Sequence, residues 1–414
     1  MADEVSQRRA TRPGESAEPE IERQGHVWRI RSLPAARQIL RARHATTQAG
    51  FTAEFIPKGR LQHHPILISD GPLHDEQRSK VARFFAPAVV ADRHHAHLVE
   101  CAERLLTQAC ADGTVSLDEL ALHYSVEVTA RIVGLTERPV SKMSRRLVAF
   151  FRQPPLDITR ADLGRTRWQW LQAAVNGLAP VARFYAADVR PAIRRRRRNP
   201  ADDVITHLIA EGYTDLDILV ECVTYATAGM VTTREFITMA AWHLLENAPL
   251  AERYRTADTR ERHAILHEII RLEPPVGHLY RRAVSPIEIE GGDGGPGDSD
   301  SRIEPGDLID LCVRQANADA ATVGAHPERL CPGRPLPAGV GAAGLAFGDG
   351  AHKCPGQPLA IAETDVLLTR LLAREPTVLA RPVLGWDDLI EGYKLRGLRL
   401  AVPSRLSEDP ARRT

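Results

Sequence analysis

The sequence has few aromatic residues (5%), a net charge of only +1 and no run of apolar residues long enough to span a membrane. The near-neutral charge argues against nucleic acid as an electrostatic partner, and the short apolar runs argue against a membrane anchor. The six cysteines include no Cys-x-x-Cys pair, which excludes the common zinc and iron–sulfur spacings and fits a reducing compartment. We therefore expect a cytoplasmic protein that binds neither nucleic acid nor a membrane.

The 414 residues do contain enough apolar side chains, 43%, for a large core. Residues 1–24 are rich in Arg, Glu, Ser and Pro and are expected to form a disordered polar tail. Because no linker divides the remainder, we expect one domain over residues 25–414. The arginine run at residues 194–198 is interpreted as a solvated helix end, with a patch for an anionic partner as the alternative.

Helical spacing of apolar residues dominates the chain. It predicts helices over about residues 33–43, 73–85, 88–111, 117–133, 140–151, 164–195, 215–246, 261–272 and 357–375. Thr214 and Asp217 predict an N-cap for the longest of these. Strand patterns are short, at residues 28–31, 308–313 and 393–403, with long irregular segments at 45–68 and 317–344 and a Gly/Asp-rich turn at 291–300. The pattern indicates mostly helix with a few short strands.

Cys354 lies in the most informative segment, Phe-Gly-Asp-Gly-Ala-His-Lys-Cys-Pro-Gly at residues 347–356. The glycines permit tight, closely approaching backbone, and a cysteine just before a helix start is favoured as a thiolate. With a Phe at the entrance of this segment and a His two residues before the Cys, the pattern suggests an axial ligand to haem iron. A buried free cysteine that packs as a small apolar residue is the alternative.

The longest predicted helix contains Ala-Gly-Met-Val-Thr-Thr at residues 228–233. Three β-branched residues after a glycine are poor helix formers, so this turn is expected to distort and to free a carbonyl. Taken alone, Thr232 is better explained by a hydroxyl that bonds back to the carbonyl one turn earlier.

The pattern Phe-Gly-x-Gly-x-His-x-Cys-x-Gly-x-x-Leu-Ala, matched over residues 347–360, resembles the haem-ligand loop of the cytochrome P450 family of bacterial soluble type. The resemblance covers about residues 25–405. It implies a mainly α fold with small β-sheets (α+β), a triangular prism of helices around a buried haem. It also implies haem b with the Cys354 thiolate as its axial ligand, in a loop shaped by Phe347, Gly348 and Gly356.

Further landmarks of the family occur upstream. Asp-x-Pro-x-His-x-x-x-Arg is matched from residue 70 to residue 78, which implies that His74 and Arg78 bind haem propionate. Their i,i+4 spacing places both on one helix face. Arg281 and His352 align with further propionate ligands, although Arg281 is hard to tell from Arg282.

The resemblance also implies a buried network that holds the cysteine loop. Glu268 and Arg271 form Glu-x-x-Arg, and Arg329 matches the third member. Such an i,i+3 pair carries little weight alone, because helices contain many. The implied role of the three residues is structural.

In the family, Ala-Gly-x-acid-Thr lies over the haem, binds dioxygen and delivers protons. Ala228, Gly229 and Thr232 match this pattern, but Val231 stands where the acid is expected. We hypothesise that ordered water on Thr232, or the carboxyl of Glu235 one turn after Val231, replaces that acid.

The substrate pocket is placed only by resemblance. Its expected lining is the loop before Ser69 together with Tyr225, Val231, Val276, His278, Leu279 and Tyr393. For His278, a polar substrate contact and a satisfied loop histidine are equally good interpretations.

The leading hypothesis is a monomeric haem-thiolate monooxygenase, an oxidoreductase that hydroxylates a small organic molecule of natural-product biosynthesis. Because no nucleotide-binding Gly-x-Gly-x-x-Gly follows a strand, electrons are expected from a ferredoxin and its reductase, docking near Lys80, Arg83 and Lys353. Without an acid at Val231, radical coupling or peroxide-driven oxidation is the alternative. A haem-binding sensor or carrier without turnover is the third hypothesis.

Overall fold

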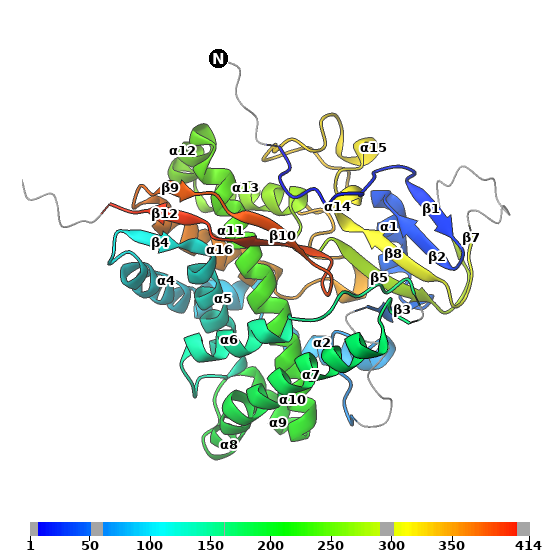
Figure 1. The fold of residues 1–414 in the computed structure, drawn as a ribbon, viewed down its shortest axis with the longest axis horizontal. Coiled ribbons are helices and arrows are strands. Elements are labelled where there is room, and N and C mark those ends of the chain that lie inside the picture. The colour runs from blue at the N-terminus through cyan, green and yellow to red at the C-terminus, as the bar shows by residue number, and fades with distance from the viewer. Residues whose placement is uncertain (1–6, 51–60, 161, 290–301, 404–414) are drawn as a thin grey trace, which may run out of the picture.

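The computed structural model describes residues 7–50, 61–160, 162–289 and 302–403. Most of the described chain is helical, and the largest sheet lies at one side of the molecule (Figure 1). The predicted mainly helical class with small sheets is confirmed. Within the described residues, no helix combines the length and the apolar character needed to cross a membrane.

Helices occur in all the predicted ranges, whereas the α-helices at residues 204–210, 248–256, 313–316 and 320–323 were not predicted. The helices are α1 (Leu33–Arg41), α2 (Gly71–Ala82), α3 (Pro87–Val89), η2 (Val90–His94), α4 (His95–Ala109), α5 (Leu117–Val133), α6 (Val140–Phe150), α7 (Arg167–Phe184), η3 (Tyr185–Val189), α8 (Arg190–Arg198), α9 (Val204–Ala210), α10 (Asp215–Tyr225), η4 (Ala226–Val231), α11 (Thr232–Leu245), α12 (Ala248–Thr256), α13 (Thr259–Leu272), α14 (Val313–Ala316), α15 (Ala320–Val323), η5 (Gly350–His352) and α16 (Gln357–Leu372).

The strands are β1 (Ile21–Gln24), β2 (Val27–Ile30), β3 (Thr46–Ala49), β4 (Thr114–Ser116), β5 (His278–Ala283), β6 (Ile287–Glu288), β7 (Arg302–Ile303), β8 (Leu308–Cys312), β9 (Thr377–Ala380), β10 (Val383–Asp387), β11 (Gly392–Arg396) and β12 (Arg399–Ala401). The five-stranded sheet has the order β1-β2-β8-β5-β3, with β2 and β8 parallel. The turn predicted at residues 291–300 lies outside the described residues. The predicted loop at 45–68 contains strand β3.

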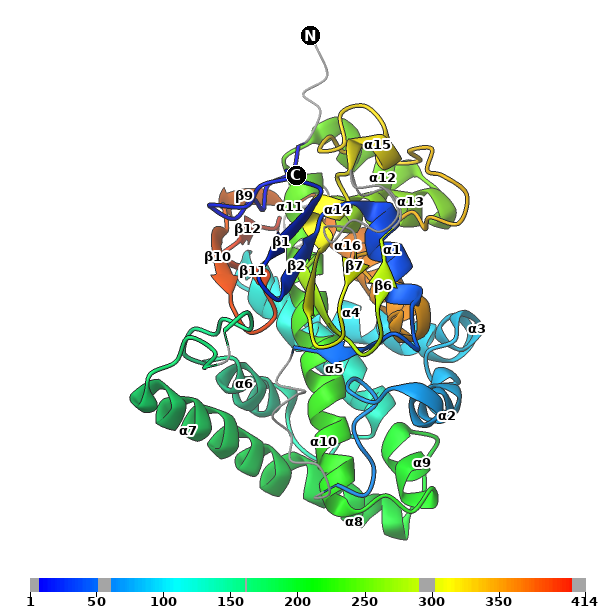
Figure 2. The same cartoon turned by 90° about the vertical axis from the view of Figure 1, so that its right-hand side faces the viewer.

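Two main apolar clusters fill the molecule. The larger joins the central helices α4, α5, α11, α13 and α16 through residues such as Tyr124, Phe236 and Leu367. The smaller lies between α1 and the five-stranded sheet, around Trp28 and Ile309. The sheet with α1 therefore packs as a second layer beside the helices, as Figures 1 and 2 show.

The N-terminal segment is not a disordered tail where the structure describes it. Residues 7–24 lie against the body of the protein and end in β1, which pairs with β2. Ala10 is fully buried, and its backbone N–H donates to the Glu273 carboxylate at 3.1 Å. The expectation for residues 1–24 is therefore wrong over residues 7–24: polar composition hid side chains that bind buried partners.

The longest predicted helix runs through the middle of the molecule as α10, η4 and α11 (Figure 1). Thr214 and Asp217 form the predicted N-cap, a reciprocal capping box. The helix widens to a π-helix at η4, so the predicted distortion at the Ala-Gly-Met-Val turn is confirmed.

Candidate functional site

The Cys354 segment is a tight loop that ends at the start of α16. The Cys354 N–H donates to the Phe347 carbonyl at 2.8 Å, which closes the loop. Gly348 and Gly350 both have φ of +68°, a conformation that only glycine adopts without strain. A Cβ at Gly350 would also collide with the carbonyl oxygen of Leu40 in α1. The glycine at position 350 therefore allows the loop to pack directly against the backbone of α1.

The Cys354 thiol is solvent-accessible, yet many protein atoms surround it. Desolvation by these atoms raises the pKa of the thiol, against hydrogen bonds from the backbone N–H groups of Gly356 and Gln357 and the charge of Arg78. The N–H groups at the helix start point toward the sulfur, as a thiolate requires.

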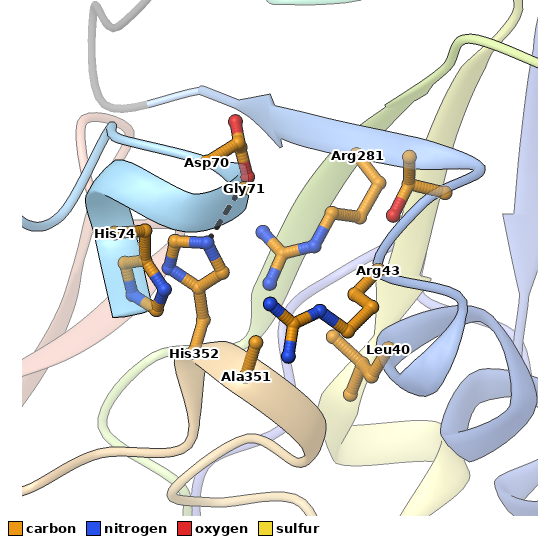
Figure 3. Close-up of a pocket in the computed structure, with 9 residues that line it drawn as sticks. Leu40, Arg43, Asp70, Gly71, His74, Arg281, Ala351 and His352 are labelled. Carbon is orange, nitrogen blue, oxygen red and sulfur yellow. Dashed lines mark hydrogen bonds and ion pairs between the residues drawn. The ribbon is translucent and has the colours of Figure 1, made fainter. Parts of the chain in front are cut away.

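A basic pocket adjoins this loop (Figure 3). The rings of His74 and His352 are stacked with centroids 4.0 Å apart. Asp70 Oδ1 lies 3.1 Å from His352 Nε2, and the Arg281 guanidinium points into the same space. The lining residues are Leu40, Arg43, Thr46, Asp70, Gly71, His74, Arg281, Ala351 and His352. The pocket thus brings together three of the predicted propionate ligands, His74 on α2, Arg281 on β5 and His352 on η5. The fourth, Arg78 on α2, lies close enough to affect the charges of both histidines.

The electrostatics of this pocket favour an anionic ligand. Burial, with the neighbouring charges of His352 and Arg78, lowers the pKa of His74 to about 4. Burial likewise lowers the pKa of Arg281 to about 10, against the nearby Asp70. Arginine and histidine nitrogens are thus gathered in a desolvated place with few carboxylates, so a bound anion would stabilise their charged forms.

Arg281 and Arg282 can now be told apart. Arg281 is 4% exposed and faces the basic pocket. Arg282 donates to the Gly306 carbonyl at 2.9 Å. Alternate residues of strand β5 point to opposite faces of the sheet, so only Arg281 reaches the pocket.

Arg78 links the loop with the long helix. Its side chain donates to the Lys353 carbonyl, and it interacts electrostatically with Cys354 and with Tyr225 in α10. Burial lowers the pKa of the Arg78 guanidinium. The Tyr225 hydroxyl is buried without a hydrogen-bond partner among the described residues.

The π-helix η4 packs closely against α5, which binds one of its backbone carbonyls. Ser125 Oγ donates to the Met230 carbonyl at 2.8 Å, and a Cβ at Gly229 would lie 3.0 Å from Thr129 Oγ1. Thr232 Oγ1 donates to the Ala228 carbonyl, which is the alternative interpretation given above. Ala228 is exposed although it lies on a central helix.

Glu235 is committed to another element. Its carboxylate is fully buried and accepts the Leu395 N–H at 2.8 Å and the Arg396 guanidinium at 2.7 Å, both on β11. Burial raises its pKa, against the charges of Arg396 and Arg234. This geometry gives Glu235 a role in attaching β11 to α11, and its role as a proton source stays a prediction.

The predicted pocket residues other than His278 differ in exposure: three are partly exposed, and two are buried. Tyr225, Val276 and Leu279 are partly exposed, and Leu279 lies close to Gly348. Val231 is 9% exposed. Tyr393 was wrongly expected in the pocket: it is fully buried in a separate apolar cluster, where its hydroxyl donates to the Glu273 carbonyl at 3.2 Å.

His278 is a satisfied histidine. Its Nδ1 lies 2.7 Å from Asp310 Oδ1, and its Nε2 lies 3.8 Å from Glu15 Oε1. These neighbours raise its pKa well above the usual value although burial acts in the opposite direction. Of the two interpretations, the geometry favours the satisfied one.

The buried network contains a different arginine from the predicted one. Glu268 and Arg271 form a double hydrogen bond at 2.6 and 2.8 Å. The third member is Arg334, whose Nε lies 3.3 Å from Glu268 Oε1 and whose side chain is 7% exposed. Arg329 is exposed, and only its carbonyl takes part, accepting from Arg334 at 2.8 Å. The prediction of Arg329 is therefore wrong.

Asn317 connects this network to the cysteine loop and was not predicted. Its backbone carbonyl accepts from Arg271, and its Oδ1 accepts the Leu345 N–H at 2.7 Å, two residues before Phe347. Asp70, the first residue of a matched motif, could have been assigned from the sequence. Asn317 and Ser125 gave no signal, because single polar residues in helices and loops are common.

Comparisons with known proteins agree with this site. The sequence model described as Cytochrome P450 matches residues 262–374, which contain Glu268, Arg271 and Cys354. Cytochrome P450 130 of Mycobacterium tuberculosis is 27% identical over 75% of this chain and 71% of its own length. Erythromycin C-12 hydroxylase of Saccharopolyspora erythraea is 26% identical over 74% of this chain and 71% of its own length.

Solved structures share the fold. A mutant of P450 EryK in complex with erythromycin B superimposes with a TM-score of 0.75 at 22% identity, covering 94% of this chain and 95% of the other. A ligand-free Mycobacterium smegmatis protein, CYP164A2, gives a TM-score of 0.72 at 26% identity over 91% of both chains. Cytochromes P450 bind haem through a cysteine thiolate. This chain belongs to the cytochrome P450 monooxygenase family.

Proposed function

We propose that the protein is a haem-thiolate monooxygenase that hydroxylates a small organic substrate in natural-product biosynthesis. The observation that carries the proposal is the Cys354 loop, which presents an accessible, desolvated sulfur beside a pocket of arginine and histidine donors. These residues fit haem b. The sulfur suits iron, and the donors around His74, His352 and Arg281 suit two propionate groups.

In this proposal Cys354 holds the iron, and His74, Arg78, Arg281 and His352 hold the propionates. The bound haem would supply the activation of dioxygen. The network of Glu268, Arg271 and Arg334 keeps the loop in one conformation through Asn317.

The exposed side of η4, around Ala228, would receive the substrate. Ala228 and Thr232 are accessible there, whereas Met230 is fully buried. Thr232 keeps its hydroxyl proton on the Ala228 carbonyl. A water held by Thr232 would stand in for the acid that Val231 lacks.

A spectrum tests the proposal. The reduced, carbon-monoxide-treated holoprotein is expected to show the strongly red-shifted Soret band of thiolate ligation. Cys354→Ser should abolish this band, whereas Cys331→Ser, at another exposed cysteine, should leave it intact. A normal haem band without thiolate character in the unmodified protein would contradict the proposal.

Turnover tests the substrate class and the electron donor. The relative named erythromycin C-12 hydroxylase supports a natural-product substrate. Candidate compounds that shift the haem spin state should be oxidised with a ferredoxin and its reductase, docked near Lys80, Arg83 and Lys353. Mass analysis should show one added oxygen atom. Spin-state shifts without any consumption of reductant would instead favour a haem-binding protein without turnover.

A second candidate function is an atypical oxidation, such as radical coupling or a peroxide-driven reaction. The specific observation is that Val231 is apolar while both oxygens of Glu235 are bound to β11. Product formed with peroxide but not with the redox partners would favour this candidate. If Thr232→Ala leaves the coupling of reductant to product unchanged, Thr232 does not hold the water.

A further inference from the structure

Helix α7 presents an apolar stripe to solvent. Its members recur every three or four residues along one face, and their exposed fractions are high for large apolar side chains: Trp168 80%, Leu171 54%, Val175 56% and Leu178 70%. The opposite face, with Ala173, Pro180 and Phe184, is buried. We call the four exposed residues the α7 stripe. Figure 2 shows α7 along an outer edge of the molecule, with α6 on its inner side.

No charged residue occurs from 168 to 182, but arginines stand at both ends. Arg167 and Arg183 are exposed, and neither is ion-paired within the part of the chain that the structure describes. The surrounding segment is strongly basic: residues 138–198 hold 15 of the 54 Lys and Arg residues and only 3 of the 53 acidic residues. The net charge of +1 for the whole chain conceals this asymmetry.

An exposed apolar stripe of this size marks an interaction surface. Its flanking charge decides what the stripe fits. A second copy of the chain would suit the three-and-four spacing, since helices pair through such a seam. An antiparallel pair, however, would place Arg167 of one copy near Arg183 of the other. It would also bring together two basic surfaces, which repel each other.

An anionic lipid surface fits both the apolar stripe and the arginines at its ends. Its acyl region takes up a convex apolar ridge without a preformed groove, and its phosphates attract the arginines at the two ends. Trp168, at one end of the stripe, is the residue type that prefers the boundary between acyl chains and headgroups.

We propose that α7 docks this protein peripherally on an anionic lipid surface, with the α7 stripe among the acyl chains and Arg167 and Arg183 at the phosphates. The proposal does not depend on the haem chemistry. It departs from the expectation, based on net charge and apolar runs, that the protein binds no membrane.

Vesicle co-sedimentation of the holoprotein tests the proposal. The protein should bind vesicles of equal parts phosphatidylglycerol and phosphatidylcholine, bind pure phosphatidylcholine much less, and be released by salt. The Leu171→Glu/Leu178→Glu variant should bind at least 10-fold more weakly. Arg167→Gln/Arg183→Gln should lose about 10- to 30-fold, since each basic residue near such a surface contributes about a factor of five.

The matched control carries the same change at two exposed apolar residues elsewhere. Leu379→Glu/Val383→Glu alters side chains that are 53% and 73% exposed on β9 and β10, and it should bind vesicles like the unmodified protein. An unchanged carbon-monoxide spectrum shows that each variant is folded.

Three results would overturn the proposal. The first is vesicle binding that Leu171→Glu/Leu178→Glu leaves unchanged, which would indicate attraction by charge alone. The second is a dimer in sedimentation velocity that this variant dissociates, without vesicle binding, which would identify a second copy as the occupant. The third is no binding to either kind of vesicle.

Discussion

Replacing the buried Glu221 by glutamine should remove a large pH dependence of stability. Glu221 lies on α10 and is 3% exposed. Its Oε1 accepts the Ile66 N–H at 2.9 Å, and its Oε2 has no hydrogen-bond partner among the described residues. Burial raises the pKa of Glu221 to about 8, from 4.5 in the unfolded chain. Near neutral pH the folded protein therefore keeps a proton that the unfolded chain has released.

The sign follows from proton linkage. The folded-state pKa is above the unfolded one, so the free energy of unfolding is unaffected below about pH 4.5 and falls as the pH rises toward 8. The fall is about 1.4 kcal/mol per pH unit, which gives up to about 5 kcal/mol over this window. Glu221→Gln cannot ionise. It should match the unmodified protein near pH 5 and be several kcal/mol more stable at pH 9.

Urea unfolding followed by far-UV circular dichroism, between pH 5 and pH 9, measures this difference. Taking the difference between the two proteins cancels all other titrating groups. Glu100→Gln, at an exposed position of α4, is the control and should track the unmodified protein throughout. A difference between Glu221→Gln and the unmodified protein that stays constant from pH 5 to pH 9 would refute the assignment of a buried, proton-retaining carboxyl.

Three further changes test the supports of the site. Arg334→Ala should cost about 1.5–3 kcal/mol in unfolding free energy, because the buried Glu268 carboxylate loses one charged partner while Arg271 remains bound to it, whereas Arg329→Ala should change it by less than about 0.5 kcal/mol; equal effects in thermal or urea unfolding would contradict the corrected network. Gly350→Ala should lower haem occupancy, read from the Soret-to-protein absorbance ratio. Gly350 has a positive φ, and an added Cβ would collide with the Leu40 carbonyl oxygen. Gly212 also has a positive φ, +81° against +68° at Gly350, but open space around it, so Gly212→Ala should leave haem occupancy unchanged. Ser125→Ala should cost about 1 kcal/mol, and an unchanged melting temperature would show that its bond to η4 is dispensable.

The site residues that could be predicted are those with a local pattern. Cys354 and its glycines are recognisable because backbone geometry restricts which residues fit there. The distortion of η4 was predictable because β-branched residues weaken a helix at a known position. His74 and Arg78 were predictable as a pair because their i,i+4 spacing places both on the helix face that contacts the cysteine loop and its pocket.

The failures concern contacts that spacing does not encode. Arg329 and Arg334 stand five residues apart in an irregular segment, where no periodicity says which one turns inward. Tyr393 follows a strand pattern that fits either face of β11, and it was assigned to the wrong one. Residues 7–24 look disordered by composition, since polar side chains that bind buried groups resemble those that bind water.

The docking of this N-terminal segment has a consequence for biosynthesis. The side chain of Arg12 binds Asp388 and Glu391, which are 376 and 379 positions further along the chain. Glu273, which receives the backbone of Arg9 and Ala10, is itself more than 260 residues away. Residues 9–12 therefore have to wait for partners that are synthesised several hundred residues later. The binding site for Arg12 forms only after the β10–β11 hairpin has folded, so we expect this segment to dock late in folding.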